Sequence, residues 1–431
     1  MNQTAIKKLS RELDAFIEQL TAGMGRPERR AAMGLYLTGL LLDGERKSIE
    51  PMAARLVDTA GEVQAMRQRL QQCVVVAEWA ERETYARVAG IVEREMPDVE
   101  ALVIDDTGFA KKGSHSVGVQ RQYSGTLGRT ENCQVATSLH LAGEAGSACI
   151  GMRLYLPESW ANDPERRRKA GVPEEVEFAE KWRIALALLD DARVAGVRPH
   201  VVLADSGYGD NGEFRRELEA RRLKYVVAVS GSAHVWPPEA RPERRPVRKH
   251  LPFVDKKHPP QPIAAFAETL SYRRVTWRDG SRGIQRSRFA AVRVRTARGH
   301  HRGSPPSDPL WLLCWWPEDE PKPAKFWLSN LPTDTSIKRL VRLAKLRWRI
   351  ERDYQEMKGE LGLDHFEGRT WRGFHHHAAL CAAAHAFLAL RRALSPPEQD
   401  SLDASNGEAP PPASCASPAA LVPTLRAAHH A

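Results

Sequence analysis

The strongest hydrophobic pattern in the chain lies late in the sequence, in the segment RLVRLAKLRWRIERDYQEMKGEL at residues 339–361. Apolar residues recur there at helical spacing and no proline interrupts them, so the pattern predicts one long helix. Arg347, Glu351 and Lys358 follow one another at spacings of four and seven residues, which places them in a narrow stripe on one helix face. Taken alone, such a stripe is typical of an exposed helix with ordinary ion pairs.

Short apolar runs elsewhere predict strands, and two of these strands end in aspartate. The run ALVID at 101–105 predicts a buried strand that ends at the pair Asp105 and Asp106. Successive strand residues face opposite ways, so only one of the pair faces a given site. The run VRPHVVLA predicts a strand that stops at Asp205 in a glycine-rich turn. Sheets of α/β proteins place ligands at such strand ends, although Asp205 is equally suited to capping the next helix.

The remaining patterns predict an α/β fold after an all-helical beginning. Strand and helix patterns alternate from residue 98 onward. Residues 113–129 are rich in glycine and predict a loop, which either faces a substrate or only connects two strands. The other predicted elements are antiparallel strands at 134–140 and 148–156, helices at 173–193 and 211–221, a strand at 224–230, short strands at 271–277, 287–294, 310–316 and 326–328, a helix start at 334–336 and a helix at 375–394.

These elements divide the chain into five predicted segments. The composition shifts twice, first to proline-rich and basic stretches between β-like runs and finally to a tail of Ser, Pro, Ala and Glu. The predicted organisation is an N-terminal helical domain at 1–97, the first part of an α/β core at 98–230, a β-rich insertion at 231–330, the second part of the core at 331–394, and a disordered tail at 395–431.

Composition narrows the class of protein. The chain has 64 Lys and Arg against 54 Asp and Glu, a net charge of +10, which favours a polyanionic partner such as nucleic acid. An arginine-rich codon bias would give the same balance. The six cysteines have no zinc-site spacing, so free thiols are expected. No apolar run spans a membrane and the N-terminus has no secretory pattern, so we expect a cytoplasmic protein.

Three carboxylates therefore become candidates for one site: one after the first strand, one after a later strand and one on the charged helix. Carboxylate oxygens suit Mg²⁺, which is a hard cation. Two Mg²⁺ ions held about 4 Å apart by such carboxylates can activate a water or a 3′-hydroxyl for phosphodiester chemistry. The combination predicts metal-dependent chemistry on a nucleic acid.

Three stretches of the sequence resemble a known family. They are VIDDTGFAKKGSHSVGVQRQYSGTLGRTENCQVATSLHL, VVLADSGYGD and LRWRIERDYQEMKGELGLDHFEGRTWRGFHHH. Together they resemble the DDE transposases of bacterial insertion sequences, in particular the insertion sequence 701 family, within the group that carries an Arg-x3-Glu-x6-Lys signature. Arg347, Glu351 and Lys358 match that signature, whereas Ala344 stands where the group usually has a tyrosine. The resemblance covers roughly residues 45–390.

The resemblance implies a role for each matching residue. Asp106, with Asp105 as the alternative, would be the first catalytic and metal-binding aspartate, Asp205 the second, and Glu351 the third acidic residue. The metal would be Mg²⁺, with Mn²⁺ as a substitute. Arg347 and Lys358 would contact the phosphates of the transposon end.

The same resemblance implies an RNase H-like core with a β-rich insertion before the glutamate. Trp327 would stack on a flipped base, by its position at the end of the insertion; a core tryptophan is the alternative. The partners would be double-stranded DNA and a second copy of the chain, in a nucleoid-associated homodimer. The N-terminal helices would bind DNA, bind another subunit or support the core.

Other functions fit parts of the sequence. A stand-alone RNase H-like endonuclease would use the same carboxylates without strand transfer, and a non-catalytic DNA-binding descendant would have no need of them. The run His375–His377 could bind metal, but no Cys or carboxylate pattern surrounds it, which favours a polar helix start.

Overall fold

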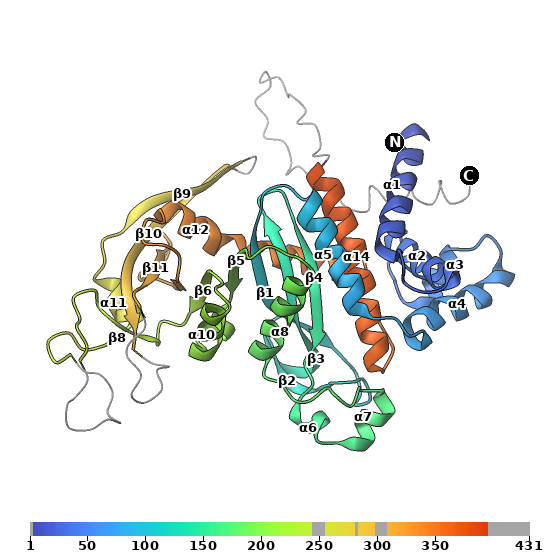
Figure 1. Cartoon of the computed structure of the whole chain (residues 1–431), viewed down its shortest axis with the longest axis horizontal. Coiled ribbons are helices and arrows are strands. Elements are labelled where there is room, and N and C mark those ends of the chain that lie inside the picture. The colour runs from blue at the N-terminus through green and yellow to red at the C-terminus, as the bar shows by residue number, and fades with distance from the viewer. Residues whose placement is uncertain (1–2, 244–254, 281–282, 298–307, 395–431) are drawn as a thin grey trace. The chain divides into compact units, whose positions relative to one another are not determined.

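The computed structural model describes residues 3–243, 255–280, 283–297 and 308–394 (Figure 1). The predicted disordered tail at 395–431 and Cys415 within it lie outside the described residues. Within them the chain forms two compact units. The first unit contains 3–99, 106–197 and 349–394, and the second contains 100–105 and the described part of 198–348. The domain boundaries inferred from the sequence remain predictions.

The first unit begins with the helices that the sequence predicts. On α1 the apolar residues Leu9, Leu13, Phe16 and Leu20 are all buried, which is the expected result of helical spacing. The helical elements are α1 (Gln3–Thr21), α2 (Pro27–Leu41), α3 (Ile49–Arg55), η1 (Ala60–Glu62), α4 (Val63–Gln71), η2 (Gln72–Val76) and α5 (Glu81–Glu95).

The strands of the first unit form an antiparallel group around β3. The group consists of β2 (Gln120–Ser124), β3 (Arg129–Gly143), β4 (Ser147–Leu154) and β1 (Val99–Ala110), which is shared with the second unit. β3 lies between β1 on one edge and β2 and β4 on the other. The prediction that β1 stops at the acidic pair is wrong, because the long β3 continues to pair beside it. The prediction of a loop throughout 113–129 is wrong for the same reason, since β2 pairs with β3 there.

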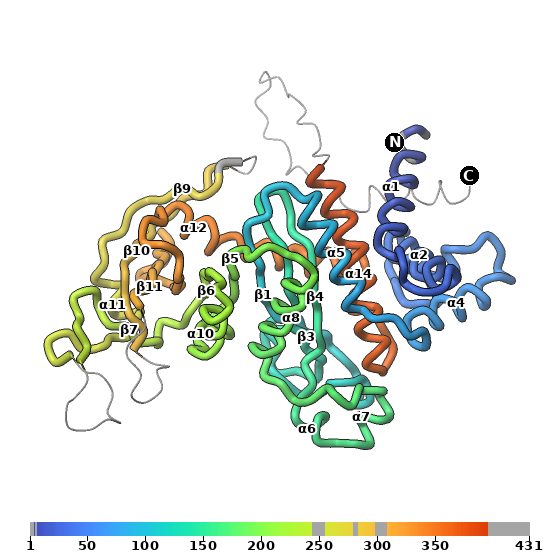
Figure 2. Tube along the Cα trace, viewed as in Figure 1, coloured from blue at the N-terminus to red at the C-terminus, as the bar shows by residue number. Residues whose placement is uncertain are grey.

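Helices pack against this sheet. α14 (Trp371–Leu394) lies along β4 with α5 beside it, as both ribbon and tube show (Figures 1 and 2). α8 (Lys181–Val194) packs on β3 and β4. This helix starts eight residues later than the start predicted at residue 173. Arg167 donates to the carbonyls of Pro173 and Val176 and holds the preceding stretch as a loop. Two short helices, α6 (Glu158–Ala161) and α7 (Pro164–Ala170), precede it.

The second unit is a mixed sheet, which confirms the α/β fold class. β1, β5 and β6 are parallel, and β12, β11 and β10 continue the sheet in antiparallel fashion from β6, so the β-rich segment extends the sheet. Its elements are β5 (Val201–Ala204), α9 (Ser206–Gly209), α10 (Gly212–Ala220), β6 (Tyr225–Val229), β7 (His234–Trp236), β8 (Gln261–Pro262), α11 (Ile263–Glu268), β9 (Arg273–Gly280), β10 (Gly283–Thr296), β11 (Leu310–Trp316), β12 (Lys325–Ser329) and α12 (Ile337–Leu346).

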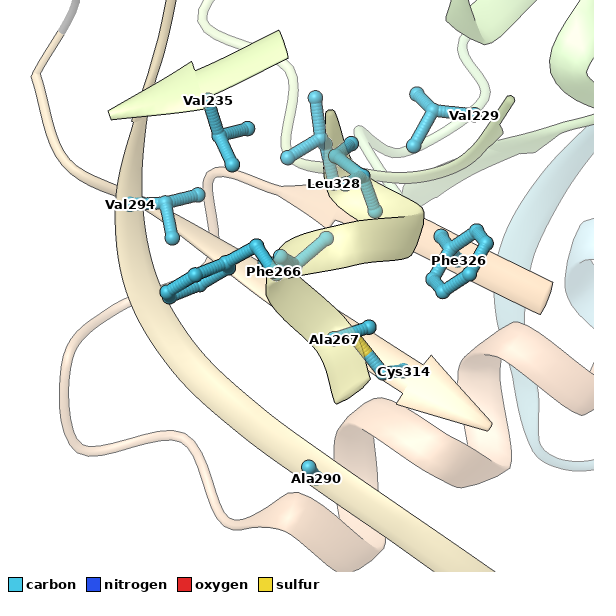
Figure 3. Packing of buried hydrophobic residues seen from close by; sticks show 11 residues of the cluster. Val229, Val235, Phe266, Ala267, Ala290, Val294, Cys314, Phe326 and Leu328 are labelled. Carbon is cyan, nitrogen blue, oxygen red and sulfur yellow. The ribbon is translucent and has the colours of Figure 1, made fainter. Parts of the chain in front are cut away.

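An apolar cluster holds the antiparallel part of the second unit together. Phe266 and Ala267 of α11 face Val294 of β10, Cys314 of β11 and Leu328 of β12 (Figure 3). Ile263, Val235 and Leu312 belong to the same cluster and are fully buried. Burying side chains of this size stabilises a fold by roughly 1.5–3 kcal/mol each, so the β-rich segment is part of a packed core.

The prediction of one long helix at 339–361 is wrong. Two helices, α12 and α13 (Trp348–Gly359), meet at Arg347, which stands in a turn. α12 buries its apolar face on β6, β9 and β10 of the second unit, whereas α13 bonds to β3 of the first. Because α12 and α13 contact strands of different units, a single straight helix would not serve both.

No helix in the described ranges has the length and apolar character needed to cross a membrane. The five cysteines in the same ranges are free and buried, in agreement with the expected thiols. They are Cys73, Cys133, Cys149, Cys314 and Cys381.

Candidate active site

Two of the candidate carboxylates lie on neighbouring parallel strands in the second unit, Asp105 within β1 and Asp205 directly after the end of β5. β1 and β5 pair in register, with Val103 opposite Leu203. The same register continued for two residues puts Asp105 beside Asp205. Residues that are partners across a parallel pair point to the same face, and adjacent strands lie about 4.8 Å apart. The side chains of Asp105 and Asp205 therefore lie next to each other on one face of the sheet.

The turn after β5 fixes the position of Asp205. Asp205 is the N-cap of the short helix α9, and its Oδ1 accepts from the backbone N of Tyr208 at 3.4 Å. A Cβ on Gly209 would lie 1.8 Å from the carbonyl oxygen of Ala228 on β6, so only glycine lets the turn pack this closely. The capping role considered from the sequence is thus present, and it holds the carboxylate at the strand end.

Asp106 points the other way and has its own partners in the first unit. Its Oδ2 accepts from Lys181 Nζ at 2.6 Å, and its Oδ1 accepts from the Thr137 hydroxyl at 3.1 Å. Ser138, the next residue on β3, bonds to Tyr354 of α13 at 2.5 Å. The side chains of neighbouring strand residues point to opposite faces of the sheet. Asp106 therefore lies on the face that α8 covers, and α13 covers the opposite face.

The two cations of the signature both reach β1. Arg347 Nη1 donates to Asp105 Oδ2 at 2.7 Å in the second unit. Lys358 Nζ donates to the carbonyl oxygen of Gly108 at 2.7 Å in the first unit. Burial lowers the pKa of Lys358 to about 8, although the charge of Asp364 acts in the opposite direction. Lys358 thus holds a positive charge near neutral pH that is easily lost in alkali.

Glu351 lies exposed in the first turn of α13. A carboxylate is favourable there because the N-terminal end of a helix carries partial positive charge. Two residues further on, Asp353 accepts from His140 of β3 at 2.8 Å, and Tyr354 bonds to Ser138. Buried contacts one half-turn away therefore hold the helix that carries Glu351 against the sheet.

The burial of Trp327 favours a core tryptophan, the alternative to the prediction that it stacks on a base. Trp327 lies on β12 between β11 and β6 and is only 7% exposed. A ring with so little exposed surface offers little area on which a base could stack. Trp348 is 39% exposed instead, and the guanidinium carbon of Arg278 lies 5.5 Å from its ring centroid. The sequence feature that could have pointed to Trp348 is its position directly after Arg347 of the signature.

The three consecutive histidines are core residues. His375, His376 and His377 are each at most 2% exposed on α14, so the predicted polar helix start is wrong. His377 bonds to the Tyr36 hydroxyl at 2.9 Å and to the carbonyl of Gly362 at 3.0 Å. Burial lowers the pKa of His377 to about 4, which keeps it neutral. Small alanines around them let α14 pack closely, and the imidazoles satisfy backbone groups inside.

The candidate carboxylates are divided between the two units. Asp105 and Asp205 belong to the second, Asp106 and Glu351 to the first. Among the described residues no group of three or more His, Cys, Asp or Glu side chains is close enough to hold a metal ion. The pair Asp105 and Asp205 still fits a hard divalent cation, since it offers carboxylate oxygens side by side where β5 ends next to β1.

Comparison with known proteins identifies the family. A model of the DDE superfamily endonucleases matches residues 19–284, and a model of the transposase DDE domain matches 182–387. The chain belongs to the DDE superfamily of endonucleases. The first match contains Asp105, Asp106 and Asp205, and the second contains Asp205 and Glu351. Every candidate carboxylate therefore lies within a region that matches the family. Enzymes of the DDE superfamily depend on divalent metal.

A curated relative extends this result. The DDE chain is 29% identical over 266 residues to a protein described as the probable transposase for insertion sequence element IS701 from Microchaete diplosiphon. The match covers 62% of this chain and 59% of that protein. The chain therefore spans about three fifths of the length of the relative it matches.

Proposed function

We propose that this DDE protein is the transposase of an insertion sequence, which cleaves DNA at the ends of its element and joins these ends to target DNA. The observation that carries the proposal is the pair Asp105 and Asp205 on the adjacent strands β1 and β5, with Arg347 of the signature bonded to Asp105. The matched relative, described as a probable transposase, supports the same conclusion.

The first metal-binding aspartate in this proposal is Asp105. The resemblance implied Asp106 and left Asp105 as the alternative. The register of β1 and β5 favours Asp105, because its side chain shares a face with Asp205, while Asp106 faces Lys181. The proposed metal ligands are Asp105, Asp205 and Glu351.

The metal would be Mg²⁺, with Mn²⁺ as a substitute; when bound, it supplies Lewis-acid activation of the attacking hydroxyl and stabilises the leaving oxygen. The chain's own residues orient the DNA. Arg347 holds Asp105 in place and is positioned to meet a phosphate oxygen, and Lys358 offers an ammonium group on the next turns of the helix. Trp348, which is more exposed than Trp327, would take the stacking role.

Two reactions would follow one another at this site. Water attacks the scissile phosphorus and the bond to the 3′-oxygen breaks, which leaves a 3′-hydroxyl on the element end. That hydroxyl then attacks a phosphorus of the target, a new phosphodiester forms and the target's own 3′-oxygen leaves. The DNA is double-stranded at both ends, and two copies of the chain acting on paired ends would form the nucleoid-associated homodimer.

Strand cleavage and joining on DNA from the flanks of the gene would test the proposal. Purified protein with Mg²⁺ should give nicks at a fixed flank position and joined products, and Asp205→Asn should lose both. Nicks without joined products would favour the stand-alone endonuclease, which the family match also supports. Binding without any cleavage would favour the non-catalytic descendant.

We expect the DNA affinity to fall as the pH rises through the pKa of Lys358. A raised pH removes the proton that the phosphate contact needs, and with a pKa of about 8 the protonated fraction falls about tenfold between pH 7 and 9. Lys358→Arg keeps its charge over this range. Fluorescence anisotropy of labelled end DNA should therefore show a tenfold loss for the natural protein and a flatter profile for the variant; equal slopes would exclude a Lys358 contact.

A further inference from the structure

The hairpin of β2 and β3 presents an exposed aromatic side chain beside cations. Tyr123 on β2 is 66% exposed, the largest exposure of an aromatic residue among the exposed apolar side chains of the described chain. Arg121 lies two residues before it on the same face of the strand and is exposed as well. Their partners on β3 are Thr130 and Asn132, so this face of the paired strands carries no carboxylate.

A second basic segment is held against the same face. The Asn132 amide donates to the carbonyl oxygens of Lys111 at 2.7 Å and Gly113 at 2.8 Å. These two bonds fix the segment of the exposed Lys112 to Asn132, the residue that pairs with Arg121 across the strands. An aromatic ring beside cations is the arrangement with which proteins bind exposed nucleic acid strands.

The hairpin is anchored at the residue that Lys358 contacts. The Thr126 hydroxyl in the hairpin turn accepts from Gly108 N at 3.1 Å, and Lys358 donates to the Gly108 carbonyl. A Cβ on Gly108 would lie 2.0 Å from Ser124 Oγ, so the turn rests directly on β1 at this glycine. All of these residues belong to the first unit, which fixes the hairpin beside Lys358.

We propose that the β2–β3 hairpin is a second DNA-binding surface. Tyr123 stacks on a base at the open end of the DNA strand that Lys358 holds, and Arg121 and Lys112 bind phosphates of that strand. The proposal rests on the proposed function for the presence of DNA and adds the surface that binds it outside the carboxylates. A ring exposed to water for two thirds of its area gains most when a flat partner covers it.

Fluorescence anisotropy without Mg²⁺ tests the stacking, with labelled flank DNA that carries a short single-stranded extension. Tyr123→Ala should weaken binding about tenfold, and Tyr123→Phe should bind as the natural protein does, because its ring still stacks. Phe178→Ala is the matched control, since Phe178 is also an exposed aromatic residue of the first unit, 37% exposed, and lies outside the hairpin. Affinity for a blunt duplex should change less.

Salt dependence tests the cations. Arg121→Ala should reduce the slope of log affinity against log salt by about 0.7–0.9, the value for one phosphate contact. Arg193→Ala, an exposed arginine at the end of α8, should leave the slope unchanged. Natural affinity in Tyr123→Ala, or a slope unchanged in Arg121→Ala, would overturn the proposal. Absence of strand joining by the natural protein would overturn the transposase function alone, since the hairpin effect is measured on binding.

Discussion

Asp105→Asn is expected to reduce metal-dependent strand cleavage at least about a hundredfold, because loss of a direct ligand exceeds the 10- to 100-fold cost of losing a supporting one. The physical reason is the parallel register that puts Asp105 and Asp205 side by side. Asparagine keeps the size of the side chain and its bond from Arg347, but it removes the negative charge that attracts the cation. Glu351→Gln is expected to have an effect of the same order.

Asp106→Asn is the matched control. Asp106 and Lys181 form a partly exposed ion pair, with side-chain exposures of 24% and 41%, so its loss should cost less than about 1 kcal/mol of stability. Cleavage should stay within a few-fold of that of the natural protein. Both variants are compared by single-turnover cleavage of labelled end DNA over a range of Mg²⁺ concentrations, with DNA affinity measured separately. If Asp106→Asn is inactive and Asp105→Asn is active, the assignment from the resemblance is right and the one from the strand register is wrong.

Asp353→Ala is expected to lower the free energy of unfolding by about 3–5 kcal/mol, the usual cost of removing one partner of a buried ion pair. Asp353 is 4% exposed and accepts from His140 at 2.8 Å and from the Ser147 hydroxyl at 2.6 Å. His140 is fully buried and would be left with an uncompensated charge. Asp353→Asn should cost less, since it keeps an acceptor for Ser147.

The same pair predicts how stability varies with pH. Burial opposes the charged form of His140, but Cys149 and the bond to Asp353 outweigh it and raise the pKa of His140 to about 10. Burial would likewise raise the pKa of Asp353, and His385 and His140 outweigh it and lower it. A raised histidine pKa contributes stability that is complete below the unfolded value of 6.5 and is lost toward pH 10.

Urea unfolding at pH 6 and pH 10 measures both effects. The natural protein should lose more stability between these pH values than Asp353→Ala, which no longer has the pair. The cleavage assay on the same samples shows whether the helix that carries Glu351 depends on this contact. Equal pH dependence in the two proteins would mean that the histidine and the aspartate are not charged together.

The distribution of apolar and polar residues along the chain was sufficient to predict most elements. Strands such as Tyr225–Val229 and Leu310–Trp316 form where short runs of apolar residues occur, because such runs must be buried whatever their neighbours are. The charged stripe, the two strand-end aspartates and the resemblance led to the DDE family before any contact was known. Each of these features involves residues close together in the sequence, so a single sequence is enough to recognise it.

Contacts between distant segments decided the rest. Alternation shows that Asp105 and Asp106 face opposite ways, but only the register with β5 and the bond from Lys181 show which face each takes. The helix break at Arg347 separates α12, which packs on strands of the second unit, from α13, which bonds to β3 of the first. Trp327 is buried on a strand that has neighbouring strands on both sides. His375–His377 are buried against segments that lie hundreds of residues away in the sequence. The sequence by itself determined which residues are candidates for the chemistry, and the tertiary structure decided which of these candidates share a face, since side-chain direction and burial are set by neighbours in space.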